Sequence, residues 1–336
     1  MAITIKEIAK QLNLSRNTVS KVLNGGKVPQ KTKDLVLNKV KELNYKSSFI
    51  NDNKKYRILL ISAKPLNNIN YFISLISSIE NYCFDNQYDL FQYTFNNKTN
   101  DFERFKNYVK ELNIDGIIAI ECFDKEFIEN LLKLGIPVCF HDFAHTSQQL
   151  PYNYDIVFTN DEQSITSIVK ELNENYQVNR FTFVGDNKHC HSFRKRQVGM
   201  ILGLMHLKVN PTTIQNINIS EEIFDYSNPN DIKEEISKLK KLPEVFICCN
   251  DFVARNVCIA LKSLDIKVPE DTLVVGFDNA SESYSLSPTI TTFTINKLHL
   301  GIEIVKTLID RIENKDIPSR VITISTTLIK RESTTR

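Results

Sequence analysis

The sequence predicts an all-α head of the helix-turn-helix type, followed by an α/β core of two lobes that are each built as a doubly wound parallel sheet. Three observations support this fold class. Residues 4–45 place apolar side chains at helical spacing around a tight turn. From residue 58 onward, short apolar runs typical of buried strands alternate with amphipathic helical patterns. This alternation starts again near residue 155, which indicates a second lobe of similar size.

The head begins with two short helices joined by a tight turn. Apolar residues at positions 5, 8, 9 and 12 share one face of the first helix, and Thr4 and Glu7 form the pattern of a capping box. After a turn at residues 11–14, Ser15 is expected to cap the second helix. Asn24-Gly25-Gly26 provides the signal that ends this helix.

A third helix is expected to close the head over the first two. It should begin near Pro29 or Gln30 and reach Leu43. Its apolar residues are Leu35, Val36, Val40 and Leu43. Together the three helices would bury a miniature core.

The outward face of the second helix carries residue types that recognise DNA. Arg and Asn can each make paired hydrogen bonds to base edges, so Arg16, Asn17 and Lys21 are expected to read bases. Hydroxyl side chains suit phosphates. The candidate DNA-binding residues are Ser15, Arg16, Asn17, Thr18, Ser20, Lys21 and Asn24. An ordinary three-helix bundle with solvated basic side chains is the alternative.

The distribution of charge favours DNA binding over that alternative. Residues 1–57 hold 13 Lys and Arg against 4 Asp and Glu, a net of +9. Because the whole chain carries +2, residues 58–336 carry −7. A basic segment attached to an acidic remainder indicates a polyanionic partner for the basic segment.

Composition places the protein among soluble globular proteins of the cytoplasm. The 336 residues contain no apolar run long enough for a transmembrane helix and no signal-peptide pattern at the start. The 7 cysteines lie mostly in apolar runs and never in a C-x-x-C pair. We therefore expect reduced, buried thiols rather than disulfides.

The remaining chain is divided by a linker and two series of elements. Residues 46–57 are polar and basic, with Phe49 and Ile50 as their apolar spot. The first series has strands at 58–61, 88–95, 116–120 and 138–141 and helices at 71–84, 101–112 and 125–134. The second has strands at 155–158, 180–184, 214–219, 245–249, 272–277 and 322–329 and helices at 162–174, 196–207, 231–239, 251–264 and 298–312. In such sheets, ligands bind beyond the carboxyl ends of the strands.

Several motifs occur in an order that matches one known family. In the first half they are the head from Thr4 to Gly25, Asp115-Gly116-Ile117-Ile118 and Gly135-Ile136-Pro137-Val138. In the second half they are Asn250-Asp251 with Ala254, Val268-Pro269-Glu270-Asp271, Val274-Val275-Gly276-Phe277-Asp278-Asn279, Pro288 with Thr291-Thr292, and Lys330-Arg331-Glu332-Ser333-Thr334. Over nearly its whole length, the chain resembles the LacI/GalR family of bacterial transcription regulators.

The resemblance implies a division into domains and an assembly. The DNA-binding head would span residues 1–45 and the hinge 46–57, ahead of a core similar to periplasmic sugar-binding proteins. The chain would cross between the lobes near residues 160, 291 and 320. The first lobe would then hold residues 58–160 and 292–320, and the second 161–291 and 321–336. A homodimer would place two heads on two half-sites of operator DNA.

The hinge and one strand end depart from the family pattern. A hinge helix usually starts with Pro-Asn and carries a Leu that wedges into the minor groove, but these positions are Ser47-Ser48 and Lys54 here. Because Lys cannot be an apolar wedge, either Phe49 or Ile50 replaces it, or the linker contacts phosphates only. The second departure is Thr159, which stands where the family has an Asp.

The resemblance also implies effector-binding residues between the lobes. Arg196 matches the family's effector-binding Arg, whose paired donors suit vicinal hydroxyls, a carboxylate or a phosphate. Asp278 and Asn250 each end a strand, where α/β folds hold ligands. The alternatives are a solvent-facing charge for Arg196, a turn residue for Asp278 and a helix N-cap for Asn250.

Aromatic and histidine residues supply further candidates. Tyr71 and Phe72 can stack on a sugar ring, although a place in the core is as probable for either. Weaker candidates of the same kind are Phe193, Phe224 and Tyr226. His141-Asp142 ends a strand and would face the same cleft, as effector contact or as a polar pair. His189-Cys190-His191 lacks a complementary cluster at fixed spacing, so no metal site is expected.

The sequence therefore predicts a cytoplasmic, dimeric, sequence-specific DNA-binding regulator with a small polar effector, most simply a repressor of carbohydrate-utilisation genes released by a sugar or sugar phosphate. No phosphate-binding loop or nucleophile motif occurs, so neither an enzyme nor a bound cofactor is expected. One alternative is a regulator of the same fold that a co-repressor or protein partner activates. Another is a solute-binding transport protein, which the basic head disfavours.

Overall fold

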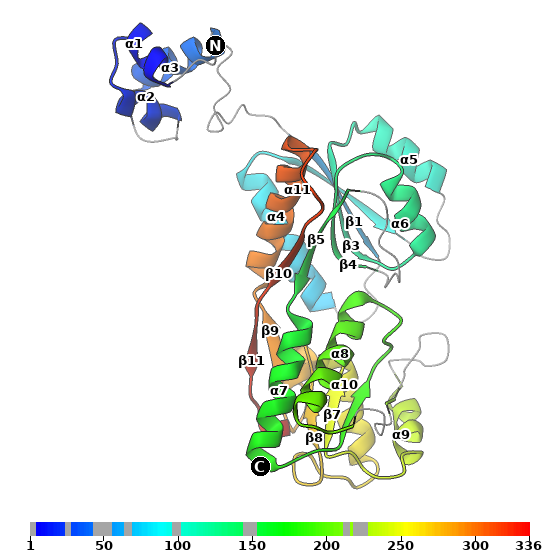
Figure 1. The fold of residues 1–336 in the computed structure, drawn as a ribbon. Helices are drawn as coiled ribbons and strands as arrows, with labels where there is room; N and C mark the ends of the chain where they lie inside the picture. The colour runs from blue at the N-terminus through cyan, green and yellow to red at the C-terminus, as the bar shows by residue number, and fades with distance from the viewer. Residues whose placement is uncertain are drawn as a thin grey trace. The chain divides into compact units, whose positions relative to one another are not determined.

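The computed structural model describes residues 5–23, 28–42, 56–63, 69–95, 102–143, 153–210, 216–217 and 228–336. The chain separates into two compact units, Met1–Lys55 and Tyr56–Arg336, whose elements are labelled in Figure 1. Among the described residues, no helix combines the length and the apolar character needed to span a lipid bilayer.

The first unit has the three expected helices, α1 (Ile5–Gln11), α2 (Arg16–Leu23) and α3 (Gln30–Glu42). The turn between α1 and α2 is tight because Asn13 adopts a left-handed backbone, with φ of 51°. The Ser15 Oγ accepts a hydrogen bond from the Thr18 N–H at 2.9 Å. The predicted helix-turn-helix and the predicted cap on its second helix are therefore confirmed.

The core of the head is formed by apolar residues from all three helices. The buried ones are Ile8, Ala9, Val19, Val22, Leu23, Val36 and Val40. Leu35 was expected to join them, but its side chain is 50% exposed. On α3, Val36 and Val40 lie one turn apart and face inward, whereas Leu35 is rotated about 100° away from Val36.

The first lobe of the second unit is built on a six-stranded parallel sheet in the order β10-β5-β4-β3-β1-β2. Its strands are β1 (Arg57–Ala63), β2 (Asp89–Phe95), β3 (Gly116–Cys122), β4 (Val138–Phe143), β5 (Asp155–Thr159) and β10 (Val321–Ile324). The central strands are buried on both faces, which explains their continuous apolar runs.

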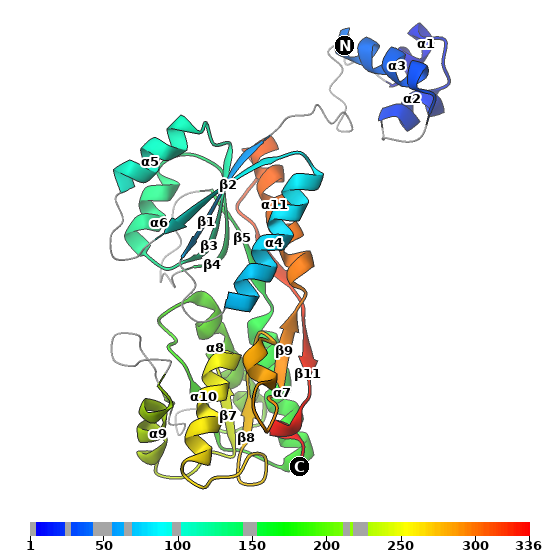
Figure 2. The ribbon, with the colours of Figure 1, turned by 180° about the vertical axis from the view of Figure 1, so that it is seen from behind.

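Helices cover both faces of this sheet. On one face α4 (Ile69–Asp85) and α11 (Lys297–Glu313) lie side by side, and on the other face lie α5 (Phe102–Glu111) and α6 (Lys125–Leu132) (Figures 1 and 2). Alternate residues of β1 enter different cores. Leu60 packs with α4 and α11, whereas Leu59 packs with α5 and α6.

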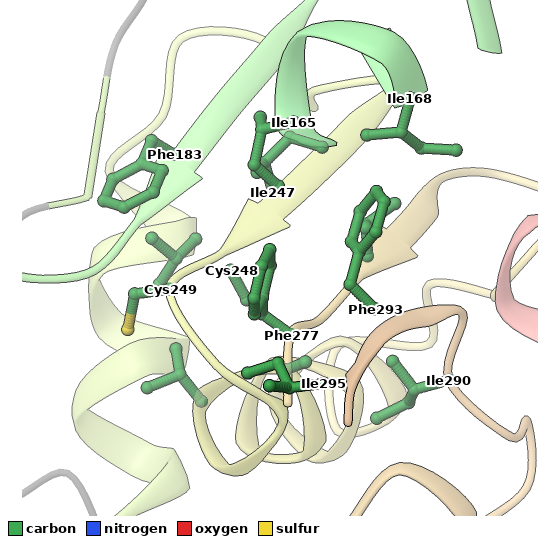
Figure 3. Packing of buried hydrophobic residues seen from close by; sticks show 14 of the residues in the cluster. Ile165, Ile168, Phe183, Ile247, Cys248, Cys249, Phe277, Ile290, Phe293 and Ile295 are labelled. Atoms are coloured by element: carbon green, nitrogen blue, oxygen red, sulfur yellow. The ribbon is translucent and has the colours of Figure 1, made fainter. Parts of the chain in front are cut away.

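The second lobe has a three-stranded parallel sheet in the order β6-β7-β8. Its strands are β6 (Phe181–Val184), β7 (Val245–Cys248) and β8 (Leu273–Val275), and its helices are α7 (Asp161–Tyr176), α8 (His191–His206), α9 (Pro229–Ser237) and α10 (Asp251–Lys262). Figure 3 shows how Phe277 and Phe293 lie among branched aliphatic side chains and cysteines in this core. Their ring centroids are 5.2 Å apart.

The strand expected at 214–219 is described only at residues 216–217. There Ile217 forms a single bridge to Val184 and donates its N–H to the Phe183 carbonyl at 2.9 Å. Residue 217 therefore extends the sheet of the second lobe at the β6 edge.

The C-terminal strand differs from its prediction. The segment expected as one strand at 322–329 forms two strands in different sheets, because β10 pairs with β5 while β11 (Thr326–Ile329) pairs with β9 (Thr292–Ile295) in an antiparallel ribbon. The chain leaves the first-lobe sheet at Ser325, so residues 321–324 belong to that sheet and not to the second lobe. Residues 292–295, which were expected in the first lobe, likewise belong to this ribbon. The chain enters α11 of the first lobe only after Ile295.

A buried ion-pair network links α11 and the segment before β10 to strand β5 of the first lobe. Asp155, at the start of β5, is fully buried and accepts two hydrogen bonds of 2.7 Å from Arg311 on α11. Arg320, just before β10, donates its backbone N–H at 2.8 Å and its Nη2 at 3.0 Å to the same carboxylate. A single Asp thus connects β5, α11 and β10.

Candidate DNA-binding face and effector site

Helix α2 separates a buried face from an exposed one. Its buried residues are Val19, Val22 and Leu23. The side chains of Arg16, Asn17 and Lys21, which are predicted to read bases, are exposed. This division follows the helical period, so packing against the head core leaves the candidate base-reading residues available to a partner.

Of the hydroxyl residues predicted to hold phosphates, Ser15 and Thr18 lie at the N-terminal end of α2 and Ser20 lies in its second half. Ser15 and Thr18 share a hydrogen bond of 2.8 Å between their hydroxyls, and Ser15 also caps the helix. Thr18 and Ser20 are partly exposed. Asn24 lies outside the described residues, as do Ser47, Ser48, Phe49, Ile50 and Lys54 of the linker.

In the second unit, Arg196 on α8 is the centre of a buried polar cluster. Its Nε donates to Asp161 Oδ1 at 2.8 Å, and its Nη2 lies 3.4 Å from Asp278 Oδ1. Its Nη1 donates to the carbonyl oxygen of Cys249. The guanidinium also lies over the Phe277 ring, 3.7 Å from the centroid. Arg196 therefore meets the carboxyl ends of β7 and β8 and is not a solvent-facing charge.

Two glycines bring Arg196 into this position. A Cβ on Gly199 would lie 2.4 Å from the Glu162 carbonyl oxygen, and one on Gly203 would lie 2.7 Å from the Val169 side chain. Only residues without a side chain therefore let α8 approach α7 this closely. The close approach places the Arg196 guanidinium beside Asp161 at the start of α7.

The polar cluster changes the ionisation of its members. Burial raises the pKa of Asp161 to about 6, although the charge of Arg196 opposes this shift. Burial likewise raises the pKa of Asp278. Burial alone would lower the pKa of Arg196, but the charges of Asp161 and Asp278 raise it overall, so the guanidinium stays charged.

Asp161 also accounts for Thr159, which stands where the family has an Asp. The Thr159 Oγ1 donates to Asp161 Oδ2 at 2.9 Å, while Asp161 Oδ1 accepts from Arg196. The Asp161 carboxylate, two residues after Thr159, therefore lies beside Arg196, and Thr159 orients it. Sequence reasoning missed Asp161 because its position at a helix start is equally typical of an ordinary acidic residue near a helix N-terminus.

The other candidates named from the sequence lie in different environments. Asn250 accepts from the Val253 N–H at 2.9 Å and is the N-cap of α10. Phe72 is 4% exposed and packs in the core beside α11, and the Tyr71 side chain lies outside the described part of the structure. Phe193 is partly buried with its ring 5.8 Å from the Arg196 guanidinium. Phe224 and Tyr226 are outside the described residues.

Two acidic residues of the first lobe face this cluster. Glu121 and Asp142 lie near the carboxyl ends of the adjacent strands β3 and β4, and both have left-handed backbones, with φ of 52° and 48°. Such conformations are uncommon for residues other than Gly and gather at functional sites. Glu121 was not predicted as a site residue, although its place directly after the apolar run 117–120 was a local signal for it.

Residues 189–192 join the second lobe to the first. The Ser192 Oγ donates to Asp142 Oδ2 at 2.7 Å. The His191 ring stacks on Phe158 with centroids 4.1 Å apart, and the His189 ring lies 4.4 Å from that of Phe123. Both imidazoles thus lie against aromatic rings of the first lobe.

His141, the neighbour of Asp142 on β4, lies inside the first lobe. It is buried, its Nδ1 lies 2.8 Å from the Val157 carbonyl oxygen, and burial lowers its pKa. A neutral ring that donates its Nδ1–H to this carbonyl fits both facts. Of the pair His141-Asp142, the Asp forms a hydrogen bond to the second lobe through Ser192.

Similar proteins are known over the whole length of the chain. The HTH-type transcriptional repressor PurR of Histophilus somni (strain 2336) is 28% identical over 346 residues, which cover 98% of each chain. A transcriptional regulator CelR–cellobiose complex matches with a TM-score of 0.71 and 18% identity, over 98% of this chain and 99% of that one. A lac repressor dimer bound to operator and the anti-inducer ONPF matches with a TM-score of 0.67 and 19% identity over 100% of both.

Two family models match separate parts of the chain. The model of the bacterial regulatory proteins of the lacI family matches residues 4–48, and that of the periplasmic binding protein-like domain matches residues 174–334. The chain belongs to the LacI family. As a member it is a DNA-binding transcriptional regulator and not an enzyme, with a helix-turn-helix head and a periplasmic-binding-protein-like core.

Proposed function

We propose that this LacI-family regulator is a cytoplasmic, sequence-specific repressor whose core holds a small polar effector, a sugar or sugar phosphate, between the lobes. The observation that carries this proposal is the buried pair of Arg196 and Asp278 on the second lobe, on the helix and strand ends that contact the first lobe through the Ser192–Asp142 hydrogen bond. Convergent polar groups at carboxyl ends of parallel strands are the usual ligand site of α/β folds.

The named relatives support the same proposal. CelR is described in complex with cellobiose, the lac repressor with operator and an anti-inducer, and the Histophilus protein as a transcriptional repressor. We therefore propose that this chain is also a repressor and that its effector is a carbohydrate. The genes it controls would be carbohydrate-utilisation genes. The Arg196 donors and the Asp278 carboxylate suit vicinal hydroxyls.

Effector binding would act through the contact between the lobes. A ligand that touches both Arg196 and the first lobe favours one degree of closure over another. In a homodimer this change would move two heads relative to each other and alter their fit to paired half-sites. We propose that α2 reads the bases through Arg16, Asn17 and Lys21, and that the effector releases the protein from its operator.

Selection of binding sites from random DNA by the purified full-length protein tests the DNA-binding half of the proposal. We expect an enriched sequence of two inverted half-sites, bound as a dimer in a gel shift. Enrichment of unrelated sequences, or binding that competitor DNA removes equally from all of them, would contradict sequence-specific recognition.

A gel shift on the selected site, with and without a panel of sugars and sugar phosphates, tests the sign of control. Loss of the shifted band with an effector supports release of a repressor. A tighter complex with an effector would instead support the alternative of activation by a co-repressor, in which the same fold is stabilised in its DNA-binding form.

A further inference from the structure

Arg331, in the closing motif of the sequence, is bonded to the connection between strands β8 and β9. Its Nη2 donates to Asn279 Oδ1 at 2.6 Å, and its Nη1 donates to Ser283 Oγ at 3.0 Å. The same Nη1 also donates to the carbonyl oxygen of Ile290 at 2.9 Å. These three uncharged acceptors lie at the start, in the middle and at the end of residues 279–290. One guanidinium therefore spans the whole connection.

The backbone at the start of this connection has an uncommon conformation. Asp278 has φ of 100° and the next residue, Asn279, has φ of 49°. Residues with a side chain enter this region rarely, and then usually one at a time. Such conformations persist where the surrounding structure holds them in place. At Asn279 this support includes the hydrogen bond that its amide oxygen accepts from Arg331.

The same turn sets the direction of the Asp278 carboxylate. This carboxylate is buried, and its Oδ1 lies 3.4 Å from Arg196 Nη2. The Asp278 N–H donates to the Phe293 carbonyl on β9 at 3.0 Å. Asp278 is thus attached to β9 through its own backbone, and to the connection through Asn279. A change of backbone conformation at Asn279 would turn the carboxylate away from Arg196.

Asn279 also links this turn to both strands of the two-stranded ribbon. Its Nδ2 lies 3.5 Å from the Thr294 Oγ1 on β9, and its Oδ1 accepts from Arg331, two residues after β11. These strands lie side by side in Figure 2 and pair along their whole length. The turn that carries Asp278 is therefore bonded to the segments through which the chain passes between the lobes.

The end of the chain is attached to the second lobe by other residues. The Ser333 Oγ donates to the Val274 carbonyl at 2.6 Å. The Thr334 carbonyl accepts from the Tyr176 hydroxyl at 2.8 Å. Because these bonds attach the terminus to β8 and α7, the bonds of the Arg331 guanidinium serve the connection rather than the terminus.

We propose that Arg331 is a positioning residue of the effector site, which holds the 279–290 connection so that Asp278 faces Arg196. The guanidinium acts through Asn279. It has several donors in one plane, an arrangement that the single ammonium of Lys does not offer. This inference rests on the proposed function, in which Asp278 and Arg196 contact the effector.

A double-mutant cycle of Arg331→Lys and Asp278→Asn tests this role without any ligand. Lys keeps the positive charge, so a direct effect of charge on Asp278 is retained while the spanning geometry is lost. Urea unfolding of the full-length protein is followed by circular dichroism. Arg331→Lys should raise the unfolding equilibrium constant about 3- to 30-fold more in wild type than in Asp278→Asn. Equal effects in the two backgrounds would show that Arg331 does not position Asp278, and would overturn the proposal.

Arg336→Lys is the matched control for the cycle. Arg336 donates its Nε to the Pro269 carbonyl at 2.8 Å, and its guanidinium lies 5.8 Å from the Tyr176 ring. The guanidinium of Arg331 lies at the same distance from a tyrosine ring. The effects of Arg336→Lys and Asp278→Asn should add. Coupling as large as that of Arg331 would show a general loss of stability and would also overturn the proposal.

The second arm measures release of the selected operator by D-ribose, cellobiose and D-ribose 5-phosphate in a gel shift. Without sugar, Arg331→Lys should bind the operator like wild type, because the head is a separate unit. It should need about 3- to 10-fold more of the active sugar for half release, as loss of a hydrogen bond predicts. Release at the wild-type concentration would overturn the proposal.

Failure of this inference can be separated from failure of the proposed function. An additive cycle, together with operator release of wild type by a sugar, would reject the role of Arg331 and leave the regulator intact. Absence of specific DNA binding by wild type, or of any response to the sugars, would reject the proposed function. In that case the ligand-free cycle still decides whether Arg331 positions Asp278.

Discussion

The carboxylate of Asp142, at the end of β4 in the first lobe, accepts a hydrogen bond of 2.7 Å from the Ser192 Oγ in the first turn of helix α8 of the second lobe. The Ser192 backbone N–H points at the same carboxylate, at 3.4 Å. Cys190, the N-cap residue of α8, makes no side-chain cap bond of its own. A negative charge at this end of a helix is favourable, so the two lobes are coupled through the helix that carries Arg196.

Replacing Ser192 by Ala should therefore shift the core toward a more open arrangement. Loss of one hydrogen bond costs about 1 kcal/mol, which is roughly a fivefold change in the balance of closed and open forms. Small-angle X-ray scattering of the full-length protein should report a larger radius of gyration than wild type.

Ser237→Ala provides the matched control for this change. Its hydroxyl donates to the Lys233 carbonyl at 2.9 Å within α9, away from the first lobe. The control should scatter like wild type. Identical scattering by Ser192→Ala, with unchanged effector binding, would show that the Asp142–Ser192 bond does not hold the lobes together.

The sequence predicted the layers of the fold because they depend on local patterns. The buried strands β3 and β7 are read from short apolar runs, and the head from its 3.6-residue period and from Ser15 as a cap. The division of 322–329 into two strands escaped prediction. Partner choice for β10 and β11 is decided by contacts with β5 and β9, which are remote in sequence.

The candidate site was predictable only in part, for a related physical reason. Arg196 and Asp278 follow from motif positions, and the structure brings them to 3.4 Å. Asp161 was missed because nothing local distinguishes it from an ordinary acidic residue at a helix start, and for Glu121 the one local signal is its place directly after the apolar run 117–120. The raised pKa of each comes from loss of hydration in the folded protein, which only the tertiary structure reveals.

Arg196→Ala should destabilise the core as well as abolish the effector response. Removal of the guanidinium leaves the Asp161 and Asp278 carboxylates buried without their cation, which costs about 3–5 kcal/mol for a broken buried pair. Urea unfolding followed by circular dichroism measures the loss.

Arg194→Ala, an exposed position on the same helix, should unfold like wild type. Because the head is a separate unit, operator binding by Arg196→Ala should persist in a gel shift below the unfolding temperature of the core. A variant that is as stable as wild type and still responds to effector would remove Arg196 from the site.

Asp155→Asn should make the first lobe less stable and less sensitive to acid. Burial alone would raise the pKa of Asp155, but hydrogen bonds from Arg311 and Arg320 lower it overall. A lowered pKa means that the carboxylate contributes stability above its ordinary value near 3.8, and that this contribution is lost as pH falls through the lowered value. The variant should lose about 3–5 kcal/mol at neutral pH and approach wild type in acid.

Urea unfolding at a series of pH values between neutral and about pH 2 measures this convergence. Asp316→Asn, which is exposed near the same end of α11, should follow the wild-type curve throughout. Parallel curves for Asp155→Asn and wild type would show that the ion pairs with Arg311 and Arg320 do not set the acid sensitivity.

Arg16→Ala should weaken operator binding and relax the choice of base at one position in each half-site. Arg16 is exposed at the first residue of α2, where a recognition helix reaches base edges. Loss of a paired contact to a base costs about 1–3 kcal/mol. Lys33→Ala, at an exposed position on α3, removes one positive charge of the head and should lower binding to all sequences alike, because attraction to the phosphates does not depend on sequence. If Arg16→Ala behaved as Lys33→Ala does in competition with single-base operator variants, Arg16 would hold the backbone rather than read a base.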